Sequence, residues 1–391
     1  MAQPPPVTPP TAHPALAERF RATSAEIHAN PETAFKEYRA AELLTEWLAA
    51  EGFSVQQGIG DLDTAFVATS GEHGPLVAIL AEYDALPGIG HGCGHNLIGA
   101  GAVLAAAHAL RQSPGHPGRL AVIGTPGEEG GGGKIRLLDA GAFDEVDAVL
   151  MFHPADRTLV TRRALAAAHV RIDFHGIAAH AAKNPADGRN ALAAMIQLFV
   201  AADGLRQHMP ERARLHGVIR HGGDAPNVIP DFTSAEFYVR DETAASALEL
   251  LERFEACARG AAIATGTRHE LTHTAPMYTE RRNNQTLATA LAGYLEASGV
   301  EIDKSPGGHP AGSSDIGNVS LKAPTIHPYI QIADRGTPSH SVPFREAAAT
   351  PHAHEMAERM ALSIGEVARD LLGRRALLDE ARHEHAQSAS D

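Results

Sequence analysis

Three short segments of this sequence offer side chains that bind transition metals. They read His-Gly-Cys-Gly-His-Asn at 91–96, Gly-Glu-Glu-Gly at 127–130 and Met-Phe-His-Pro at 151–154. Their metal-binding groups are the thiol of Cys93, the imidazoles of His95 and His153, and the carboxylates of Glu128 and Glu129. Such groups from separate segments form the ligand set of a transition-metal centre, and a second carboxylate beside a ligand can act as a base. The pattern predicts a metallohydrolase.

Apolar runs that predict buried strands precede the candidate acidic and imidazole groups. The pairs are 76–81 with Glu82 and Asp84, 120–125 with the glutamate pair, and 148–152 with His153. An Ala-rich helix is expected at 97–111, directly after the Cys-His cluster. Because binding sites in open α/β sheets form outside the carboxyl ends of the strands, we expect these groups to share one site.

Length and periodicity predict two domains. A chain of 391 residues exceeds what one hydrophobic core usually serves. From about residue 169, two alternating strands and two helical stretches predict a β-α-β-β-α-β insertion; they are 170–174, 233–239, 191–207 and 244–264. We therefore expect an α/β domain at 15–168 and 275–373, with a mostly parallel central sheet flanked by helices. An inserted α+β, ferredoxin-like domain at 169–274 would leave an edge or face free for dimer formation.

Composition limits the compartment and the partners. The formal charge of −14 opposes nonspecific binding to nucleic acid or anionic membranes, and no apolar run approaches about 18 residues. The two cysteines, Cys93 and Cys257, make no disulfide framework, which favours a reducing compartment, the cytoplasm. A Pro-rich tail at 1–14 and a polar tail at 374–391 are expected to be disordered.

The individual motifs also have simpler interpretations. A Cys-x-His pair arises by chance, and adjacent glutamates are usually solvated. His153, His180 and His340 are each ambiguous alone among 23 histidines. The glycine run at 130–133 does not match a phosphate-binding loop, because that pattern needs glycine where Glu128 stands and a hydroxyl residue where Ile135 stands.

Taken together, the motifs over 15–370 resemble the M20 metallopeptidases. The matching segments are Glu-Tyr-Asp-Ala-Leu-Pro at 82–87, Gly-His-Gly-Cys-Gly-His-Asn at 90–96, Gly-Glu-Glu-Gly-Gly at 127–131, Phe-His-Pro at 152–154, Ala-His-Ala-Ala at 179–182, Pro-Asn-Val-Ile-Pro at 226–230, and His340. Within that family the chain is similar to the amidohydrolase branch with aminoacylase-like, hippurate-hydrolase-like and aminobenzoyl-glutamate hydrolase-like enzymes. The resemblance implies a zinc-peptidase-like catalytic domain and an inserted dimerisation domain.

The resemblance also implies a role for each candidate residue. It implies a centre of two divalent metal ions, zinc first, with manganese, cobalt or nickel also compatible. The implied ligands are Cys93, His95, Glu129, His153 and His340. Glu128 would be the general base and Asp84 would orient a ligand or the metal-bound water. His180 would polarise the scissile carbonyl from the other subunit of a homodimer, with Asn227 nearby, and Arg240 would clamp a substrate carboxylate.

Several alternatives stay open at this point. Residues 312–320 depart from the Gly-x-Glu-Asp pattern of the branch and look closer to the aminobenzoyl-glutamate and dipeptide-hydrolase subgroup, so an N-acyl amino acid or a dipeptide is the expected small-molecule substrate. His327 is an alternative to His340, and Glu82 stands where other branches place a histidine ligand. The competing classes are a non-catalytic metal-binding or metabolite-binding relative and an acyltransferase acting through a Cys93 thioester; the retained ligands and glutamate pair argue against both.

Overall fold

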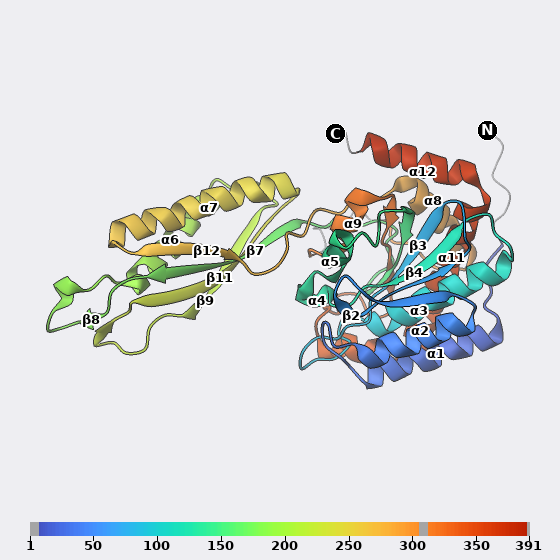
Figure 1. Cartoon of the computed structure of the whole chain (residues 1–391), viewed down its shortest axis with the longest axis horizontal. Coiled ribbons are helices and arrows are strands. Elements are labelled where there is room, and N and C mark those ends of the chain that lie inside the picture. Colours follow the sequence, from blue (N-terminus) through green and yellow to red (C-terminus); the bar gives the residue numbers. More distant parts are fainter. Residues whose placement is uncertain (1–7, 305–311, 389–391) are drawn as a thin grey trace. The chain divides into compact units, whose positions relative to one another are not determined.

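Two units make up the part of the chain that the computed structural model describes, residues 8–304 and 312–388 (Figure 1). The second unit consists of Ala164–Glu280 and Gly312–Gly317, and the first unit contains the rest. Part of the predicted N-terminal tail, 1–7, lies outside the described residues. The first helix begins at Pro14, where a proline suits the first turn because its missing N–H needs no partner.

A six-stranded sheet forms the centre of the first unit, in the order β1-β2-β4-β3-β5-β13. Its strands are β1 (Ser54–Ile59), β2 (Leu62–Ser70), β3 (Leu76–Ala81), β4 (Arg119–Gly124), β5 (Val146–Leu150) and β13 (Thr325–Ile326). Strands β4, β3, β5 and β13 run parallel, and β1 and β2 are antiparallel. The predicted mostly parallel sheet is confirmed. A short parallel pair, β6 (His153–Ala155) and β14 (Tyr329–Gln331), continues beyond β5 and β13.

Helices pack on this sheet and on one another. They are α1 (Pro14–Ala29), α2 (Tyr38–Ala50), α3 (His95–Gln112), α4 (Glu128–Gly131), α5 (Gly133–Asp139), α8 (Gln285–Ala297), α10 (Val342–Ala347), α11 (Pro351–Gly373) and α12 (Arg375–Gln387), with α9 (Ile316–Lys322) crossing the boundary between the units. Helix α3 is buried from its first residue through Ala109, so it lies in the core rather than on its surface. Gly365 of α11 allows the two helices to approach closely, because a Cβ there would lie 2.7 Å from the Ala105 carbonyl oxygen of α3.

The C-terminal segment corrects one prediction. Residues 374–391 were expected to fray, but 375–387 form α12. The helix buries Leu378 and Ala381, and Glu384 accepts hydrogen bonds from the first two amides of α8 at 2.6 and 2.8 Å. Two apolar residues three positions apart make too narrow a stripe to be recognised in a polar sequence, yet they suffice to dock the helix.

The second unit contains a four-stranded antiparallel sheet in the order β12-β7-β11-β9. Its elements are β7 (Ala166–His175), β8 (Ala179–His180), the 3₁₀ turn η1 (Pro185–Asp187), α6 (Ala191–Arg206), β9 (Arg214–His221), β10 (Val228–Ile229), β11 (Phe232–Asp241), α7 (Ala244–Thr265) and β12 (Arg268–His273). The succession β7-α6-β9-β11-α7-β12 is the predicted β-α-β-β-α-β pattern. Helices α6 and α7 cover one face of the sheet, as Figure 1 shows, over a core that includes Phe174, Phe237 and Phe254. Across 8–304 and 312–388, no helix has the length and apolar content to cross a bilayer.

Candidate metal centre

The polar residues that follow the parallel strands lie together at one edge of the central sheet. Strand β3 is followed by Glu82 and Asp84, β4 by the loop that carries Glu128 and Glu129, and β5 by His153. Since these three strands are parallel, their carboxyl ends meet at the same edge. Helix α3 begins there with His95. Topology thus assembles groups that are far apart in the sequence.

Asp84 orients two of the neighbouring groups. Its Oδ1 lies 3.1 Å from Nδ1 of His95, and its Oδ2 accepts a hydrogen bond of 3.0 Å from the Glu129 backbone amide. Burial opposes ionisation of Asp84, but His95 holds the pKa of this carboxyl below its usual range. Burial likewise opposes charge on His95, yet Asp84, Glu82 and Glu129 raise its pKa to about 10. The cluster therefore favours positive charge, and a divalent cation can supply it.

The candidate ligand atoms form three overlapping groups in the first unit. Within each group the nitrogen, sulfur or oxygen atoms lie within 4.8 Å of one another. The groups are Glu82, His95 and His153; Cys93, Glu129 and His340; and His95, Glu128 and Glu129. His95 and Glu129 each belong to two groups, so the sets are contiguous. The structure thereby brings together all five residues predicted as metal ligands, and Glu128 stands beside them.

Unsatisfied buried atoms show that this donor set fits metal ions. Among the described residues, Nε2 of His95 and Oε1 of Glu129 are buried without a hydrogen-bond partner. Such orphaned acceptors are costly in a native interior unless something compensates them. Shared thiolate, imidazole and carboxylate donors suit two divalent cations, which dinuclear sites hold about 3.5–4 Å apart.

His153 is held in the form that binds a metal. Its Nδ1 lies 2.6 Å from the Pro154 carbonyl oxygen, so this nitrogen carries the proton and Nε2 keeps its lone pair. Burial and the positive charge of His95 lower the pKa of His153 to about 4. The ring is therefore neutral at physiological pH.

The structure separates the two candidates for the last histidine ligand. Nε2 of His340 lies 3.4 Å from Oε1 of Glu129, and its backbone has a φ of 61°, an uncommon left-handed conformation for a non-glycine residue. A hydrogen bond from its amide to the Gly92 carbonyl oxygen, 3.0 Å long, holds this conformation. His327 is fully buried with its ring centre 5.8 Å from that of His153, and it belongs to none of the three ligand groups. The geometry favours His340.

Cys93 is unsuited to act as a free nucleophile. Its side chain is buried, and burial together with Glu129 and Glu128 raises the pKa of the thiol well above its usual range. A thiolate at this position needs an adjacent cation to stabilise it. This argues for metal ligation and against the thioester route.

Glu82 has a buried partner that sequence reasoning missed. Nζ of Lys134 lies 2.5 Å from Oε1 of Glu82, and both side chains are at most 1% exposed. Oε2 of Glu82 lies 3.6 Å from Nε2 of His95. Burial opposes ionisation, but Lys134 and His95 keep the pKa of Glu82 below its usual value. Lysine is almost never fully buried unless paired, and nothing in the sequence around Lys134 shows that it will be.

The remaining predicted residues belong to the second unit. His180 and Asn227 are brought together where β8 pairs with β10, since the Ala181 amide donates to the Asn227 carbonyl oxygen at 2.9 Å. Nδ1 of His180 accepts from the Lys183 amide at 3.1 Å, which leaves Nε2–H as a donor on an exposed ring. Arg240, at the end of β11, donates from Nη1 to Ser313 at 2.9 Å.

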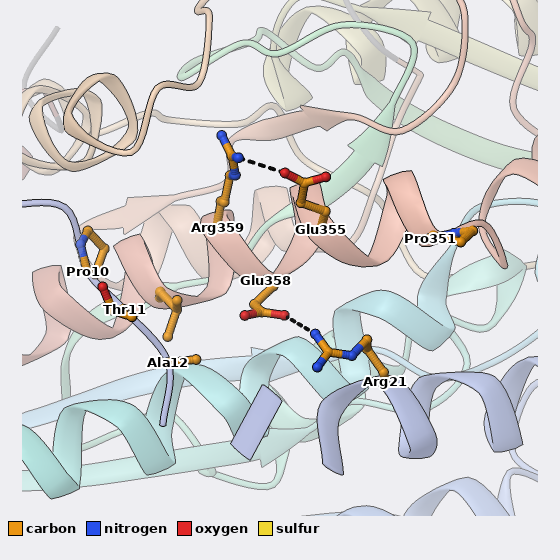
Figure 2. Close-up of a pocket in the computed structure, with 9 residues that line it drawn as sticks. Pro10, Thr11, Ala12, Arg21, Pro351, Glu355, Glu358 and Arg359 are labelled. Carbon is orange, nitrogen blue, oxygen red and sulfur yellow. Dashed lines mark hydrogen bonds and ion pairs between the residues drawn. The ribbon is translucent and has the colours of Figure 1, made fainter. Parts of the chain in front are cut away.

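A surface pocket between α1 and α11 offers no comparable chemistry (Figure 2). Its charged residues pair with one another: Arg21 with Glu358 at 2.8 Å, and Arg359 with Glu355 at 2.6 Å. Because these charges are already neutralised by their neighbours, the pocket does not compete with the metal centre as a functional site.

Comparison with known proteins identifies the class. Residues 160–265 match the family described as the peptidase dimerisation domain, M20_dimer. The chain is 37% identical over 385 residues to the Xaa-Arg dipeptidase of Mus musculus, which covers 94% of this chain and 89% of that protein. It is also 37% identical over 272 residues to one of the p-aminobenzoyl-glutamate hydrolase subunits of Escherichia coli (strain K12), which covers 64% of this chain and 56% of that protein.

A solved structure agrees with this result. The Bacillus subtilis YXEP protein, described as a dinuclear metal binding peptidase from the M20 family, aligns with a TM-score of 0.69 at 21% identity and covers 92% of this chain and 99% of that chain. The fold, the donor set and the full-length relative define a metal-dependent amidohydrolase. The chain belongs to the M20 peptidase family, which confirms the predicted family, fold class and enzyme class.

Proposed function

We propose that this enzyme hydrolyses the amide bond of dipeptides or N-acyl amino acids at the centre formed by Cys93, His95, Glu129, His153 and His340. The observation that carries the proposal is the convergence of these groups, with shared His95 and Glu129, beside Glu128. Dipeptides with a C-terminal arginine are the first substrates to test, because the relative that matches over most of both chains is an Xaa-Arg dipeptidase. p-Aminobenzoyl-glutamate is the second.

The chain's own residues divide the chemical work. When bound, two divalent cations would lower the pKa of a shared water and stabilise charge on the carbonyl oxygen. Glu128 takes the proton of the attacking water and returns it to the leaving nitrogen. Asp84 keeps His95 and the Glu129 backbone in place through its two hydrogen bonds. His180 donates from Nε2 to the scissile carbonyl, and the planar guanidinium of Arg240 binds the substrate carboxylate.

Metal identity and substrate can be tested together. We infer that zinc is the native metal, because a thiolate beside imidazoles and carboxylates suits it, although manganese, cobalt or nickel could occupy the same donors. Elemental analysis of the purified protein identifies the metal. Activity on Xaa-Arg dipeptides, p-aminobenzoyl-glutamate and N-acetyl amino acids should disappear on chelation and return with the identified ion.

A Glu128→Gln variant separates catalysis from metal binding. It should hold the wild-type metal content and lose at least about 100-fold in kcat, since a positioned general base contributes about 10²–10⁴-fold. Full turnover by this variant, or full turnover by the metal-stripped enzyme, would refute the mechanism. Wild-type protein that binds metal but cleaves none of the three substrate classes would favour a non-catalytic relative.

We also propose a homodimer formed through the second unit. Strand β9 is an edge of the four-stranded sheet, and it exposes 52% of Val218 and 40% of Ile219. Helix α6 exposes 52% of Ile196 and 66% of Val200. An unpaired edge with exposed apolar residues suits pairing with a second copy. Light scattering should give a dimer for the wild type and a monomer for Val200→Glu.

A dimer allows His180 to act from a second copy of the chain. Mixing His180→Ala subunits with Glu128→Gln subunits then restores part of the activity, because each hybrid dimer contains one intact combination. Absence of recovery despite demonstrated subunit exchange would show that His180 does not act in trans.

A further inference from the structure

A fully buried carboxylate outside the metal centre holds the loop that carries the glutamate pair. Glu37 lies just before α2, and its Oε1 accepts hydrogen bonds of 2.9 Å from the backbone amides of Phe35 and Gly127. Its Oε2 accepts from the Thr64 hydroxyl at 2.9 Å. Gly127 directly precedes Glu128. A residue 90 positions earlier in the chain therefore fixes the backbone from which the glutamate pair projects.

The Phe35 side chain packs against the same loop. Its ring occupies the space where a Cβ on Gly127 or Gly131 would stand, since such an atom would lie 2.6 Å from the ring. The Arg136 guanidinium lies 4.8 Å from the ring centre, which is cation–π distance. Residues 127–131 therefore need glycine at these two positions because an aromatic ring packs directly on their backbone.

Phe35 adopts an unfavourable backbone conformation to make this contact. Its φ is 62°, in the left-handed region that non-glycine residues seldom occupy. Such strain persists only where the surroundings over-determine it, and it clusters at functional sites. Here the hydrogen bond from the Phe35 amide to Glu37 and the contact with the glycine loop supply the restraint.

The same segment also contacts the loop that carries Asp84. The Ala85 amide donates to the Glu32 carbonyl oxygen at 2.7 Å, and Thr33 forms a parallel bridge with Ala85. Residues 32–37 thus join the backbone just after Asp84 to the backbone just before Glu128. Asp84 itself accepts from the Glu129 amide, so the two loops are linked on both sides.

We propose that Phe35 and Glu37 are positioning residues that hold residues 127–133 so that Glu128 and Glu129 face the metal centre. The inference rests on the proposed roles of that glutamate pair. Both residues act through the Gly127 backbone, because the contacts that carry the inference reach the loop rather than a candidate ligand. Their removal should therefore loosen the loop without emptying the rest of the donor set.

The test uses the full-length protein, with zinc as the probe and two kinds of control. Phe35→Ala and Glu37→Ala remove the two contacts, whereas Glu37→Gln keeps an oxygen that accepts from both amides. Glu32→Ala is the matched control. The Glu32 carboxylate lies in the same segment and accepts from the Arg39 and Ala40 amides at 3.0 Å, but those bonds hold the start of α2 rather than the glycine loop.

The expected result is a local loss of order with a matching loss of metal affinity. Phe35→Ala and Glu37→Ala should weaken Zn²⁺ binding, measured by chelator competition, by about 10-fold, as the loss of groups that orient ligands does. Amide hydrogen exchange should rise over residues 127–133, and kcat should fall with KM unchanged within about 2-fold. Glu37→Gln and Glu32→Ala should keep wild-type zinc affinity.

Each outcome decides between positioning and general stability. Wild-type zinc affinity and wild-type exchange at 127–133 in Phe35→Ala would overturn the proposal. So would an equal loss of affinity in Glu32→Ala, because that would mean that any loosening of the segment has the same effect. If Glu37→Ala does not fold, the half-buried Phe35 still provides the test. Retained turnover in Glu128→Gln, with the predicted affinity changes at Phe35, would refute the proposed catalysis but not the positioning.

Discussion

Replacing Lys134 by methionine should destabilise the first unit strongly, although the substitution is conservative in shape. The ammonium group lies 2.5 Å from Glu82 with both side chains at most 1% exposed. Methionine keeps the apolar volume of the stem and removes only the charge. The Glu82 carboxylate would then remain in the interior without its main partner.

The magnitude follows from the burial and from what is left behind. Removing one partner of a buried ion pair costs about 3–5 kcal/mol, because the other charge stays uncompensated. His95 lies 3.6 Å from the second Glu82 oxygen, and the neighbouring carboxylates raise its pKa to about 10, so it retains part of the compensation at neutral pH. We therefore expect a loss near the lower limit, about 3 kcal/mol.

Urea unfolding followed by tryptophan fluorescence measures this loss. Trp47 is the single tryptophan and is fully buried in the first unit, so its signal reports on that unit. Lys322→Met is the matched control. Nζ of Lys322 lies 3.0 Å from Asp144, but the two side chains are 46% and 65% exposed, and such pairs contribute about 0–1 kcal/mol. A Lys134→Met loss within about 1 kcal/mol of the control would refute the argument.

Three further predictions concern charge, packing and substrate binding. Burial and Asp84 raise the pKa of Glu37 from 4.5 to about 7, so its stabilising protonated form is lost as pH rises through 7; Glu37→Gln should gain about 2 kcal/mol relative to wild type between pH 5 and pH 8 in the same urea assay. Leu378→Ala should cost about 2–4 kcal/mol, because the side chain is 1% exposed, whereas an α12 that contributes nothing would make it neutral. Arg240→Lys should raise KM about 10-fold with little change in kcat, since lysine cannot bind a carboxylate with two prongs; an equal fall in kcat would assign Arg240 to the chemical step.

The strands and the location of the site could be predicted because both depend on local patterns. Short apolar runs followed by acidic or imidazole residues fix where parallel strands end, and the rule that sites form at those ends brings Glu82, Glu129 and His153 together without further information. The inserted domain was predictable for the same reason, since the alternation in β7 and β11 and the helical periods of α6 and α7 are strong local signals.

The contacts that tune the site were not predictable, because they join distant parts of the chain. Glu37 looks like an ordinary helix-start glutamate, and only the fold shows that it meets Gly127. Lys134 looks like a solvated cation after a glycine run, yet it is buried against Glu82. The choice between His327 and His340 also needed coordinates, since both follow the second half of the sheet and only His340 lies within ligand distance of Cys93 and Glu129.

The buried charges explain why such supporting contacts are needed. Glu82, Asp84 and Glu129 lie close together in a largely buried region, and like charges there repel each other and lose hydration. Lys134 neutralises one of them and His95 faces the others, but orphaned acceptor atoms on His95 and Glu129 remain. Divalent cations that bind those atoms only in the folded chain must stabilise it by mass action. The first unit should therefore unfold at higher urea concentration when metal is present, and the increase should shrink in any variant that misplaces Glu129.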